Sequence, residues 1–370
     1  MKILFIITKG NNIGGAQIYV RDLAIACKKD GHHVTVAVGI KGDLCDQLST
    51  HGIESVIIKN LVVPISPFKD IFALFEIKQL LQKFKPDVVS INSSKAGIVG
   101  RLACYFTKTP NVFVVHGWSY TPGISYLKIL VFKIIEKCLV PFSHYWICVS
   151  MFDYNFGITH KTLKKDKSRL IYNGISESLK NIPKKKTVND IPVLVMVARH
   201  DHQKDHKTLF HALKNIDNIK VLLIGDGPLM QQNINLANEL KIENKVSFMG
   251  YRNDVKQILD NADLFALISN WEGFPLSTLE AMSFSLPVLV SNVGGAAEAV
   301  KENISGYIIP RQNHALLAEK IKQLCDIGTA NNRKTLGDNA RKMFLENYTF
   351  EIMYKKTMSI FKEVALNKPN

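Results

Sequence analysis

The sequence predicts an α/β protein made of two doubly wound parallel-sheet domains, and three observations support this expectation. Short apolar runs of buried-strand type alternate with helical patterns along the chain. The length of 370 residues suits two domains better than one core. The polar stretch 179–191, which contains Pro183 and three consecutive lysines, separates two series of these elements, as interdomain linkers do.

The first series of elements extends to residue 178, and we place the first domain at 1–178. Residues 1–7 predict a buried strand, residues 8–15 a loop, and residues 16–28 a helix. Amphipathic helices are expected at 72–84 and 125–140, and another helix follows residues 93–97. Further strands are expected at 33–38, 55–59, 86–92, 112–115, 147–150 and 169–175.

The second series predicts a second domain at 192–349. An amphipathic pattern at the end of the chain predicts a last helix at about 350–366. Strands are expected at 193–197, 221–224, 246–251, 262–268 and 287–290. Because ligands of open parallel sheets bind at the carboxyl ends of the strands, the functional site is expected in the loops that follow these strands.

Composition narrows the classes of function. The net charge of +15 predicts attraction to polyanions such as nucleic acid, anionic lipid or phosphorylated substrates. The chain has no helix-turn-helix, zinc or aromatic-basic signature, which disfavours nucleic-acid binding. The six cysteines lack CxxC or metal-like spacing, so we expect reduced cysteines in a cytosolic protein. We find no secretion signal and no apolar run of the roughly 18 residues that a membrane span needs.

The stretch 269–282 carries the densest candidate chemistry. Glu272 lies in the loop after a predicted strand, and Glu280 lies eight positions later in a helical pattern. The start of that helix, near Ser277 and Thr278, offers backbone N–H groups and a positive dipole end to a phosphate. The alternative is that residues 277–280 form a capping box, in which Glu280 only satisfies the helix start.

Two cations follow another strand. Arg199 and Lys204 come directly after residues 193–197, where Arg can bind a diphosphate bidentately and Lys as a point charge. The alternative is a solvated charged loop. Three nearby histidines lack a carboxylate or cysteine partner at metal-like spacing, so we expect no metal site there.

Two features of the first domain also lie at strand ends. Gly14 and Gly15 allow close approach of a ligand before a helix, although a plain turn is the alternative. They do not form a GxGxxG fingerprint, which disfavours an NAD enzyme. His116 follows the strand 112–115 in the ligand-facing position, and a purely structural histidine is its alternative.

Together these motifs resemble those of the retaining glycosyltransferases of family GT4, which have the GT-B architecture. Glu272, seven intervening residues and Glu280 resemble the paired-glutamate motif of the family, and Arg199 with Lys204 resembles its diphosphate-binding pair. Residues 225–228 match the Gly-Asp-Gly-Pro motif of the family. The resemblance covers nearly the whole chain. It implies two Rossmann-like domains facing a central cleft, with the last helix crossing back onto the first domain.

The resemblance also implies a role for each candidate residue. Glu272 and His116 would approach the donor sugar and are the catalytic candidates, and Glu280 would hold the ribose hydroxyls. The residues implied at the donor diphosphate are Arg199, Lys204, Gly15, Ser277 and Thr278. The residues implied near the base are Gly250 and Tyr251. Other residues implied near the donor are Gly14, Gly225, Gly273, Phe274, Pro275 and Leu276.

The activity implied is transfer of a hexose-type sugar from a nucleotide-diphosphate sugar, expected to be a UDP-sugar, with retention of configuration. The acceptor implied is a glycan or a polyprenyl-diphosphate-linked saccharide in capsule or lipopolysaccharide synthesis. The sequence after His116 departs from the usual His-Asp and, with residues 93–97, is similar to polysaccharide-assembly transferases. Where relatives carry an aspartate after the Asn173-Gly174 turn, this chain has Ser176, so we assign that turn no chemistry.

No cofactor and no metal are expected, since enzymes of this kind need no bound metal. Alternatives on the same architecture are a nucleotide-sugar epimerase and a phosphorylase. No lysine is clearly placed to hold pyridoxal phosphate, which disfavours the phosphorylase. A basic nucleic-acid-binding protein is the remote alternative.

Lysines and large apolar residues concentrate between Phe68 and Phe142. The expected helix 125–140 alternates the two types, and such a helix can lie on an anionic membrane surface. An ordinary buried helix is the alternative. We therefore expect a cytoplasmic enzyme that associates peripherally with the inner face of the cell membrane. Its expected partners are the nucleotide-sugar donor, the acceptor and the anionic membrane surface.

Overall fold

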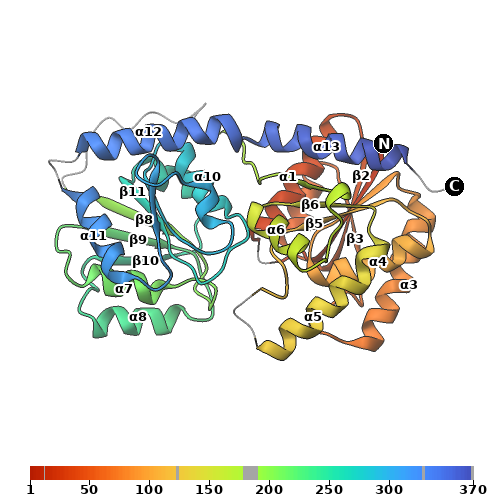
Figure 1. Cartoon of the computed structure of the whole chain (residues 1–370), viewed down its shortest axis with the longest axis horizontal. Helices are drawn as coiled ribbons and strands as arrows, with labels where there is room; N and C mark the ends of the chain where they lie inside the picture. Colours follow the sequence, from red (N-terminus) through yellow and green to blue (C-terminus); the bar gives the residue numbers. More distant parts are fainter. Residues whose placement is uncertain (12, 122–124, 178–190, 327–329, 368–370) are drawn as a thin grey trace. The chain divides into compact units, whose positions relative to one another are not determined.

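The computed structural model describes all residues except 12, 122–124, 178–190, 327–329 and 368–370 (Figure 1). The chain divides into two compact units. Unit 1 comprises residues 1–172 and 353–370, and unit 2 comprises residues 173–352. Of the expected linker, residues 179–190 lie outside the described residues.

Unit 1 is built on a seven-stranded parallel sheet of order β3-β2-β1-β4-β5-β6-β7. The central strands are apolar and buried because helices cover both faces of a parallel sheet. The strands are β1 (Lys2–Lys9), β2 (His33–Ile40), β3 (Glu54–Ile57), β4 (Val88–Ile91), β5 (Asn111–Val115), β6 (Tyr145–Cys148) and β7 (Ser168–Leu170).

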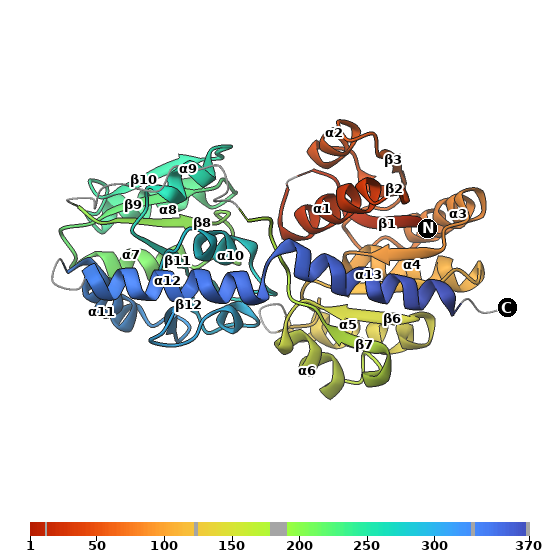
Figure 2. The same cartoon turned by 90° about the horizontal axis from the view of Figure 1, so that it is seen from above.

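The helices of unit 1 form two layers. On one face α1 packs against β1 and β2. On the other face α4 packs against β1, β4 and β5, with α3 and α5 on its two sides (Figures 1 and 2). The helices are α1 (Gly15–Lys29), α2 (Asp43–Ser49), α3 (Pro67–Phe84), α4 (Ser94–Phe106), α5 (Tyr126–Leu139) and α6 (Met151–Thr159), with 3₁₀ turns η1 (Val140–Phe142) and η2 (Lys165–Lys167).

Helix α3 is longer than the sequence pattern predicts. It begins at Pro67 rather than at 72, because proline at the first helical position has a suitable φ and needs no N–H partner. It ends where Lys85 adopts a left-handed conformation, φ 50°, immediately before Pro86.

The last helix, α13 (Phe350–Leu366), belongs to unit 1 from Met353 onward. The Phe361 ring lies 6.1 Å from that of Phe5 in β1. The Tyr354 hydroxyl donates a hydrogen bond to the Asp30 carboxylate, 2.5 Å away, just after α1. The prediction that the last helix returns to the first domain is confirmed.

Unit 2 contains a six-stranded parallel sheet of order β10-β9-β8-β11-β12-β13. Its strands are β8 (Val193–Val197), β9 (Lys220–Ile224), β10 (Val246–Gly250), β11 (Leu264–Leu267), β12 (Val288–Ser291) and β13 (Gly306–Ile309). Its helices are α7 (His206–Leu213), α8 (Met230–Glu239), α9 (Val255–Asp260), α10 (Leu276–Ser283), α11 (His314–Cys325) and α12 (Ala330–Asn347), with the 3₁₀ turn η4 (Ala296–Ala299). The predicted α/β class with two parallel sheets is confirmed.

Each sheet has one point where the strand order reverses direction. In unit 1 this point lies between β1 and β4, and in unit 2 between β8 and β11. Loops that leave neighbouring strands at such a point diverge to opposite faces and leave a crevice for a ligand. Most candidate residues of both units follow strands at or beside these points, whereas Gly250 ends β10, one strand further out, and Tyr251 follows it. Among the described residues, no helix is long and apolar enough to cross a membrane.

Candidate functional site

The loops after β8 and β11 are joined by backbone hydrogen bonds. Lys204 and Ser269 form an isolated antiparallel bridge. The Asp205 N–H donates to the Ile268 carbonyl at 2.9 Å, and the Asn270 N–H donates to the Gln203 carbonyl at 2.7 Å. These bonds place the cation-bearing loop directly beside the paired-glutamate loop, although the two are far apart in the sequence.

The Glu272 carboxylate lies at the centre of this junction. Lys204 forms an ion pair with its Oε1 atom. The Ser269 hydroxyl donates to the same oxygen at 2.6 Å, and Gln203 Nε2 donates to Oε2 at 3.1 Å. The Glu272 side chain is only 5% exposed. Both oxygens are thus bonded, and the carboxylate is held in one orientation.

A glycine supports the backbone of Glu272. Gly294 has φ 52°, and a Cβ atom there would lie 1.9 Å from the Glu272 carbonyl oxygen. The contact leaves no room for any other side chain at 294, because real Cβ atoms do not approach backbone oxygen so closely. The loop after β12 therefore packs directly against the backbone of Glu272.

The two predicted diphosphate-binding cations differ in their surroundings. The Lys204 side chain is 13% exposed and pairs with Glu272. The Arg199 side chain is 57% exposed and pairs with Asp201 at 3.2 Å. Lys204 is therefore held in place, whereas Arg199 remains largely in solvent.

Helix α10 begins two positions earlier than a capping box over residues 277–280 would require. Its N-cap is Pro275, and no side chain caps it, so Ser277 lies inside the first turn. Glu280 lies still further inside the helix. The capping-box alternative for residues 277–280 is therefore wrong. The Thr278 side chain is fully buried in the core, so Thr278 can offer a ligand only its backbone N–H.

Residues 273–276 combine loop and core positions. The Phe274 ring is buried and lies 5.4 Å from that of Tyr348, and Leu276 is also buried. The Asn173 side-chain amide donates to the Phe274 carbonyl at 2.9 Å. The Asn-Gly turn to which we assigned no chemistry thus positions the paired-glutamate loop. Gly273 and Pro275 lie on either side of Phe274 in this loop.

The glycines after β9 allow two loops to pack closely. Gly225 has φ 135°, and a Cβ atom there would lie 2.2 Å from the Ala198 carbonyl oxygen. The Gly225 N–H donates to the Gly250 carbonyl at 2.8 Å, at the end of β10. Tyr251 follows and is 70% exposed. Gly225 therefore contributes to the site by letting the turn after β9 approach the loop after β8.

A pair of buried histidines lies in the loop after β8 and at the start of α7. The rings of His200 and His206 stack at 4.2 Å, and both residues are buried. Burial lowers the pKa of His206 to about 3 and that of His200 below its usual value, so both are neutral at pH 7. His202 contributes its carbonyl, which accepts from Asn270 Nδ2 at 3.1 Å. Among the described residues, no group of three or more His, Cys, Asp or Glu is arranged to hold a metal ion.

In unit 1, His116 follows β5 and contacts two neighbouring elements. Its Nε2 atom lies 3.3 Å from Asn92 Oδ1 after β4, and its ring meets Tyr19 of α1 edge-on at 4.8 Å. Burial lowers the pKa of the His116 imidazole to about 4, so it is neutral at pH 7. Gly14 and Gly15 lie at the start of α1, after β1.

The structure thus assigns the predicted site residues to two sets, one in each unit. Sequence reasoning missed Gln203, Ser269 and Asn173, which hold Glu272 or the backbone beside it. For Gln203 and Ser269 the only available signal was proximity to the predicted motifs, and for Asn173 it was the Asn-Gly turn in which the residue lies. Gln203 precedes Lys204, and Ser269 lies three residues before Glu272.

Two family models match the chain one after the other. The model described as Glycosyltransferase Family 4 matches residues 13–179, and that described as Glycosyl transferases group 1 matches residues 178–343. The boundary between the two matches falls beside the expected linker.

Named relatives of similar length also match. The chain is 27% identical over 365 residues to the UDP-Gal:alpha-D-GlcNAc-diphosphoundecaprenol alpha-1,3-galactosyltransferase of Escherichia coli, covering 94% of this chain and 90% of that protein. It is 25% identical to the N,N'-diacetylbacillosaminyl-diphospho-undecaprenol alpha-1,3-N-acetylgalactosaminyltransferase of Campylobacter jejuni, covering 95% and 97%. Among solved structures, Anabaena Alr3699/HepE in complex with UDP and glucose superposes with a TM-score of 0.84 at 22% identity, covering 98% and 99%. The structural match shows that the two chains share a fold.

Proposed function

We propose that this chain, which belongs to the family 4 glycosyltransferases, transfers a sugar from a UDP-sugar to a polyprenyl-diphosphate-linked saccharide with retention of configuration. The observation that carries the proposal is the junction of Lys204 with Glu272 at the switch point of unit 2. It places a nearly buried cation and a fixed carboxylate where an open parallel sheet binds ligands. The names of the two relatives support both the donor and the acceptor.

In the proposed reaction an acceptor hydroxyl attacks C1 of the sugar on the face from which the diphosphate departs. The bond from C1 to the diphosphate oxygen breaks, and the hydroxyl proton passes to the departing diphosphate. Negative charge then develops on the departing UDP. Lys204 and Arg199 follow β8 and would stabilise this charge. The first turn of α10, which no side chain caps, would add backbone N–H groups and a positive dipole end.

The fixed orientation of Glu272 suggests two tasks for it. One carboxylate oxygen pairs with Lys204, so Glu272 orients the cation that we assign to the diphosphate. The carboxylate would also face the sugar as the reaction proceeds. Glu280, within α10, would accept hydrogen bonds from the ribose hydroxyls. In unit 1, neutral His116 would hydrogen-bond a sugar hydroxyl rather than supply positive charge.

We propose that the reaction requires no metal ion, because Lys204 and Arg199, which we assign to the diphosphate, would supply the positive charge that a metal ion would otherwise provide. The reaction rate should be the same in buffer containing EDTA and in buffer containing magnesium. A rate that falls at least tenfold on chelation and recovers with a divalent ion would contradict this part of the proposal.

We also propose that the enzyme works on the cytoplasmic face of the cell membrane as a peripheral protein. A saccharide carried on a polyprenyl chain is confined to the bilayer, so the enzyme must meet it at the bilayer surface. The exposed lysines and apolar residues of unit 1 support this placement.

The decisive experiment supplies the full chain with a panel of UDP-, GDP- and ADP-sugars and a synthetic GlcNAc-diphospho-polyprenol. We expect UDP release that depends on the acceptor, and a disaccharide product whose new linkage keeps the donor configuration by NMR. Failure of every nucleotide sugar to stabilise the protein or to turn over would contradict the transferase proposal. An epimerised nucleotide sugar formed without acceptor would instead favour the epimerase.

A further inference from the structure

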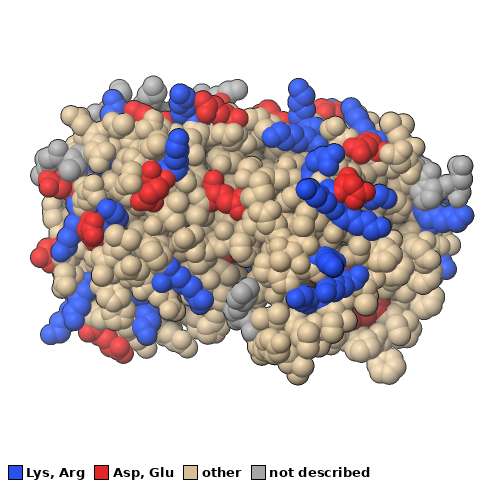
Figure 3. All heavy atoms as spheres, in the orientation of Figure 1, with Lys and Arg blue, Asp and Glu red and all other residues tan. Residues whose placement is uncertain are grey.

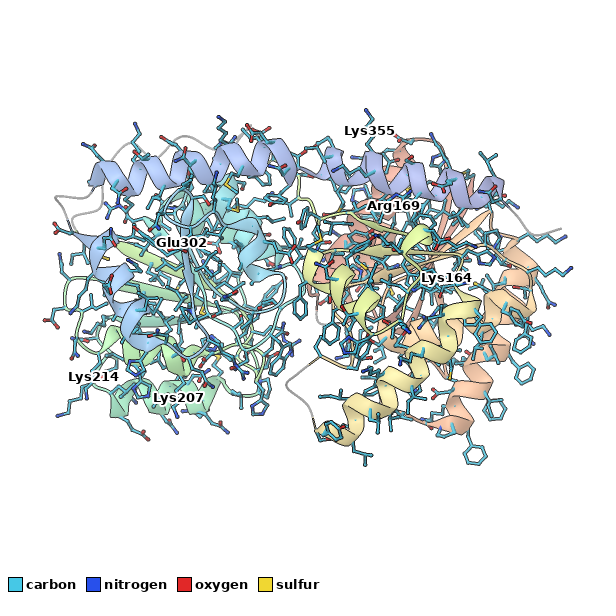
Figure 4. The ribbon with its side chains drawn as sticks, in the orientation of Figure 1. Lys164, Arg169, Lys207, Lys214, Glu302 and Lys355 are labelled. Atoms are coloured by element: carbon cyan, nitrogen blue, oxygen red, sulfur yellow. The ribbon has the colours of Figure 1, made fainter. Side chains whose placement is uncertain are left out.

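Helices α3 and α5 each expose an apolar stripe to solvent. On α3 the stripe is Phe68, Ile71, Phe72 and Phe75, and on α5 it is Leu127, Leu130, Val131 and Ile134. The two stripes have the same spacing, i, i+3, i+4 and i+7, which places each on one side of its helix. Phe68 is 80% exposed and Leu127 69%. The surface over the lower ends of α3 and α5 is accordingly largely tan in Figure 3, and aromatic rings project from the outer side of α3 in Figure 4.

The protein core does not account for these stripes. Helix α3 already buries Ala73, Ile77 and Leu81 on its inner side. A surface helix of a globular protein normally has a polar outer side, and contiguous exposed apolar surface marks a site of interaction. The two stripes therefore need a partner that this unit does not provide.

The acidic side chains of α3 and α5 face neighbouring elements, whereas the exposed charged side chains are basic. All three acidic side chains are held by neighbours, and none is exposed. Asp70 pairs with Lys95 of α4 at 2.6 Å, and Glu136 is buried against Arg101 of α4 at 2.7 Å. Glu76 accepts a hydrogen bond from the Asn60 side chain.

The exposed charges of the two helices are lysines only: Lys69, Lys83, Lys128 and Lys137. An apolar surface with a purely basic border is complementary to a bilayer that contains anionic lipid. It is a poor match for a second copy of the same surface, because lysine would face lysine across a twofold contact.

The position of the stripes in the fold fits a lipid-borne acceptor. In a parallel sheet each helix runs antiparallel to its strands, so its N-terminal half lies nearer the carboxyl edge of the sheet. Both stripes begin in the first turn of their helix, and Val63 and Ile65 add exposed apolar surface just before α3. Gly15 and His116 lie at the same edge of the sheet.

We propose that the apolar stripes of α3 and α5 insert between the headgroups of an anionic bilayer, with the lysines beside them contacting lipid phosphate. The proposal rests on the proposed function only for its purpose, which is to bring the edge of the sheet that carries His116 to an acceptor held in the membrane. It identifies the surface and the lipid chemistry by which the peripheral association would occur.

The test is sedimentation of the full chain with vesicles of equal parts phosphatidylglycerol and phosphatidylcholine, and with vesicles of phosphatidylcholine alone. At low salt we expect at least tenfold stronger partition onto the anionic vesicles, and a weaker difference at high salt because salt screens the lysines. Phe72→Ser combined with Leu127→Ser should lower partition at least tenfold. The matched control is Leu366→Ser, which removes an 85% exposed leucine near the end of α13.

A second pair of variants separates charge from insertion. Lys128→Gln combined with Lys137→Gln should lower partition by about fivefold for each lysine, equivalent to about 1 kcal/mol each. The control Lys355→Gln changes an exposed lysine of α13, labelled in Figure 4, and should bind vesicles as the wild type does.

Recovery of the wild type in the supernatant with both vesicle types would overturn the proposal. So would equal partition of the Phe72 and Leu127 double variant and the wild type. A dimer in light scattering that the same double variant abolishes would assign the surface to self-association instead. UDP-dependent thermal stabilisation, measured on each variant, keeps this outcome apart from the transferase proposal, since binding of UDP by unit 2 does not require the membrane surface.

Discussion

The two units place their candidate residues at the same point of similar sheets but hold them by different forces. In unit 2 the central group is the Glu272 carboxylate, which Lys204, Ser269 and Gln203 fix by charge and hydrogen bonds. In unit 1 the central group is His116, a neutral ring held by Tyr19 and Asn92.

The two units also differ in the apolar residues that they expose to solvent. Large exposed apolar residues gather on α3 and α5 of unit 1 but are scattered singly over the described part of unit 2, as at Ile304 and Leu345. The contrast indicates that unit 2 suits a small, highly charged ligand, whereas unit 1 suits an acceptor presented on a larger apolar surface. The predictions below test this contrast, from the largest expected effect to the smallest.

The largest effect is expected for Glu272→Gln. The substitution keeps the shape of the side chain but removes the charge that orients Lys204, so turnover should fall about 100-fold, a loss typical of an electrostatic group at a reacting centre. UDP affinity should change much less. Acceptor-dependent UDP release and calorimetric UDP titration measure the two quantities. Glu243→Gln, at an exposed position, is the control, and equal losses in turnover and affinity would contradict the assignment.

Arg199→Ala and Lys204→Ala should both weaken UDP binding, by roughly 1.5–3 kcal/mol, the scale of a hydrogen bond to a charged group. They should differ in stability. Lys204→Ala leaves the Glu272 carboxylate, whose side chain is only 5% exposed, without its cation. The melting temperature of this variant should therefore fall, whereas that of Arg199→Ala should not. Lys207→Ala, an exposed lysine beside them in sequence, is the control. Unchanged UDP affinity in both variants would disprove the diphosphate assignment.

Gly294→Ala should destabilise the protein by about 2 kcal/mol or more, because strain at a positive φ adds to a collision with the Glu272 carbonyl. Gly52→Ala separates the two causes. Gly52 also has a positive φ, 66°, but a Cβ atom there meets nothing within 4 Å. Chemical denaturation should show the larger loss for Gly294→Ala. Equal losses of stability in the two variants would mean that the loop after β12 shifts and removes the collision with Glu272.

His116 should make stability depend on pH in a predictable direction. Its pKa of about 4 lies below that of an unfolded histidine, near 6.5, so the unfolded state takes up this proton first as pH falls. The stabilisation from neutral His116 is complete above about pH 6.5 and is lost as pH falls toward 4. His116→Asn should therefore lose less free energy of unfolding between pH 7 and pH 5 than the wild type. His51→Asn, at an exposed position, should lose as much as the wild type does.

The smallest effect is expected for Thr278→Val. The Thr278 hydroxyl is buried without a hydrogen-bond partner, so an isosteric methyl group should leave stability unchanged or slightly raised. UDP affinity should also stay within about twofold if only the backbone N–H serves the ligand. A loss of more than about 1 kcal/mol in UDP binding would show that the hydroxyl reaches the diphosphate.

The sequence by itself determined the alternation of elements and the location of the candidate loops. Runs such as 3–7 and 193–197 are apolar without interruption, as strands buried on both faces of a parallel sheet must be. Such a sheet brings the carboxyl ends of all its strands to one edge. The order of strands and helices therefore predicted that Glu272 lies at this edge of the sheet of unit 2, and His116 at the corresponding edge of the sheet of unit 1. The paired-glutamate spacing then linked the chain to its family.

The tertiary structure alone decided which groups hold Glu272. Its contacts with Gln203 and Lys204 depend on backbone hydrogen bonds between loops more than 60 residues apart, and no local pattern encodes that pairing. The same is true of Asn173, whose amide reaches Phe274 across 101 positions.

Tertiary packing also decided which side of α3 and α5 faces solvent. Both helices have amphipathic sequence patterns, but the pattern does not identify which of their apolar residues face the sheet and which face solvent. In the structure Asp70 and Glu136 lie on the inner sides of these helices, where they pair with Lys95 and Arg101 of α4. The stripes that contain Phe72 and Leu127 lie on the opposite, solvent-facing sides.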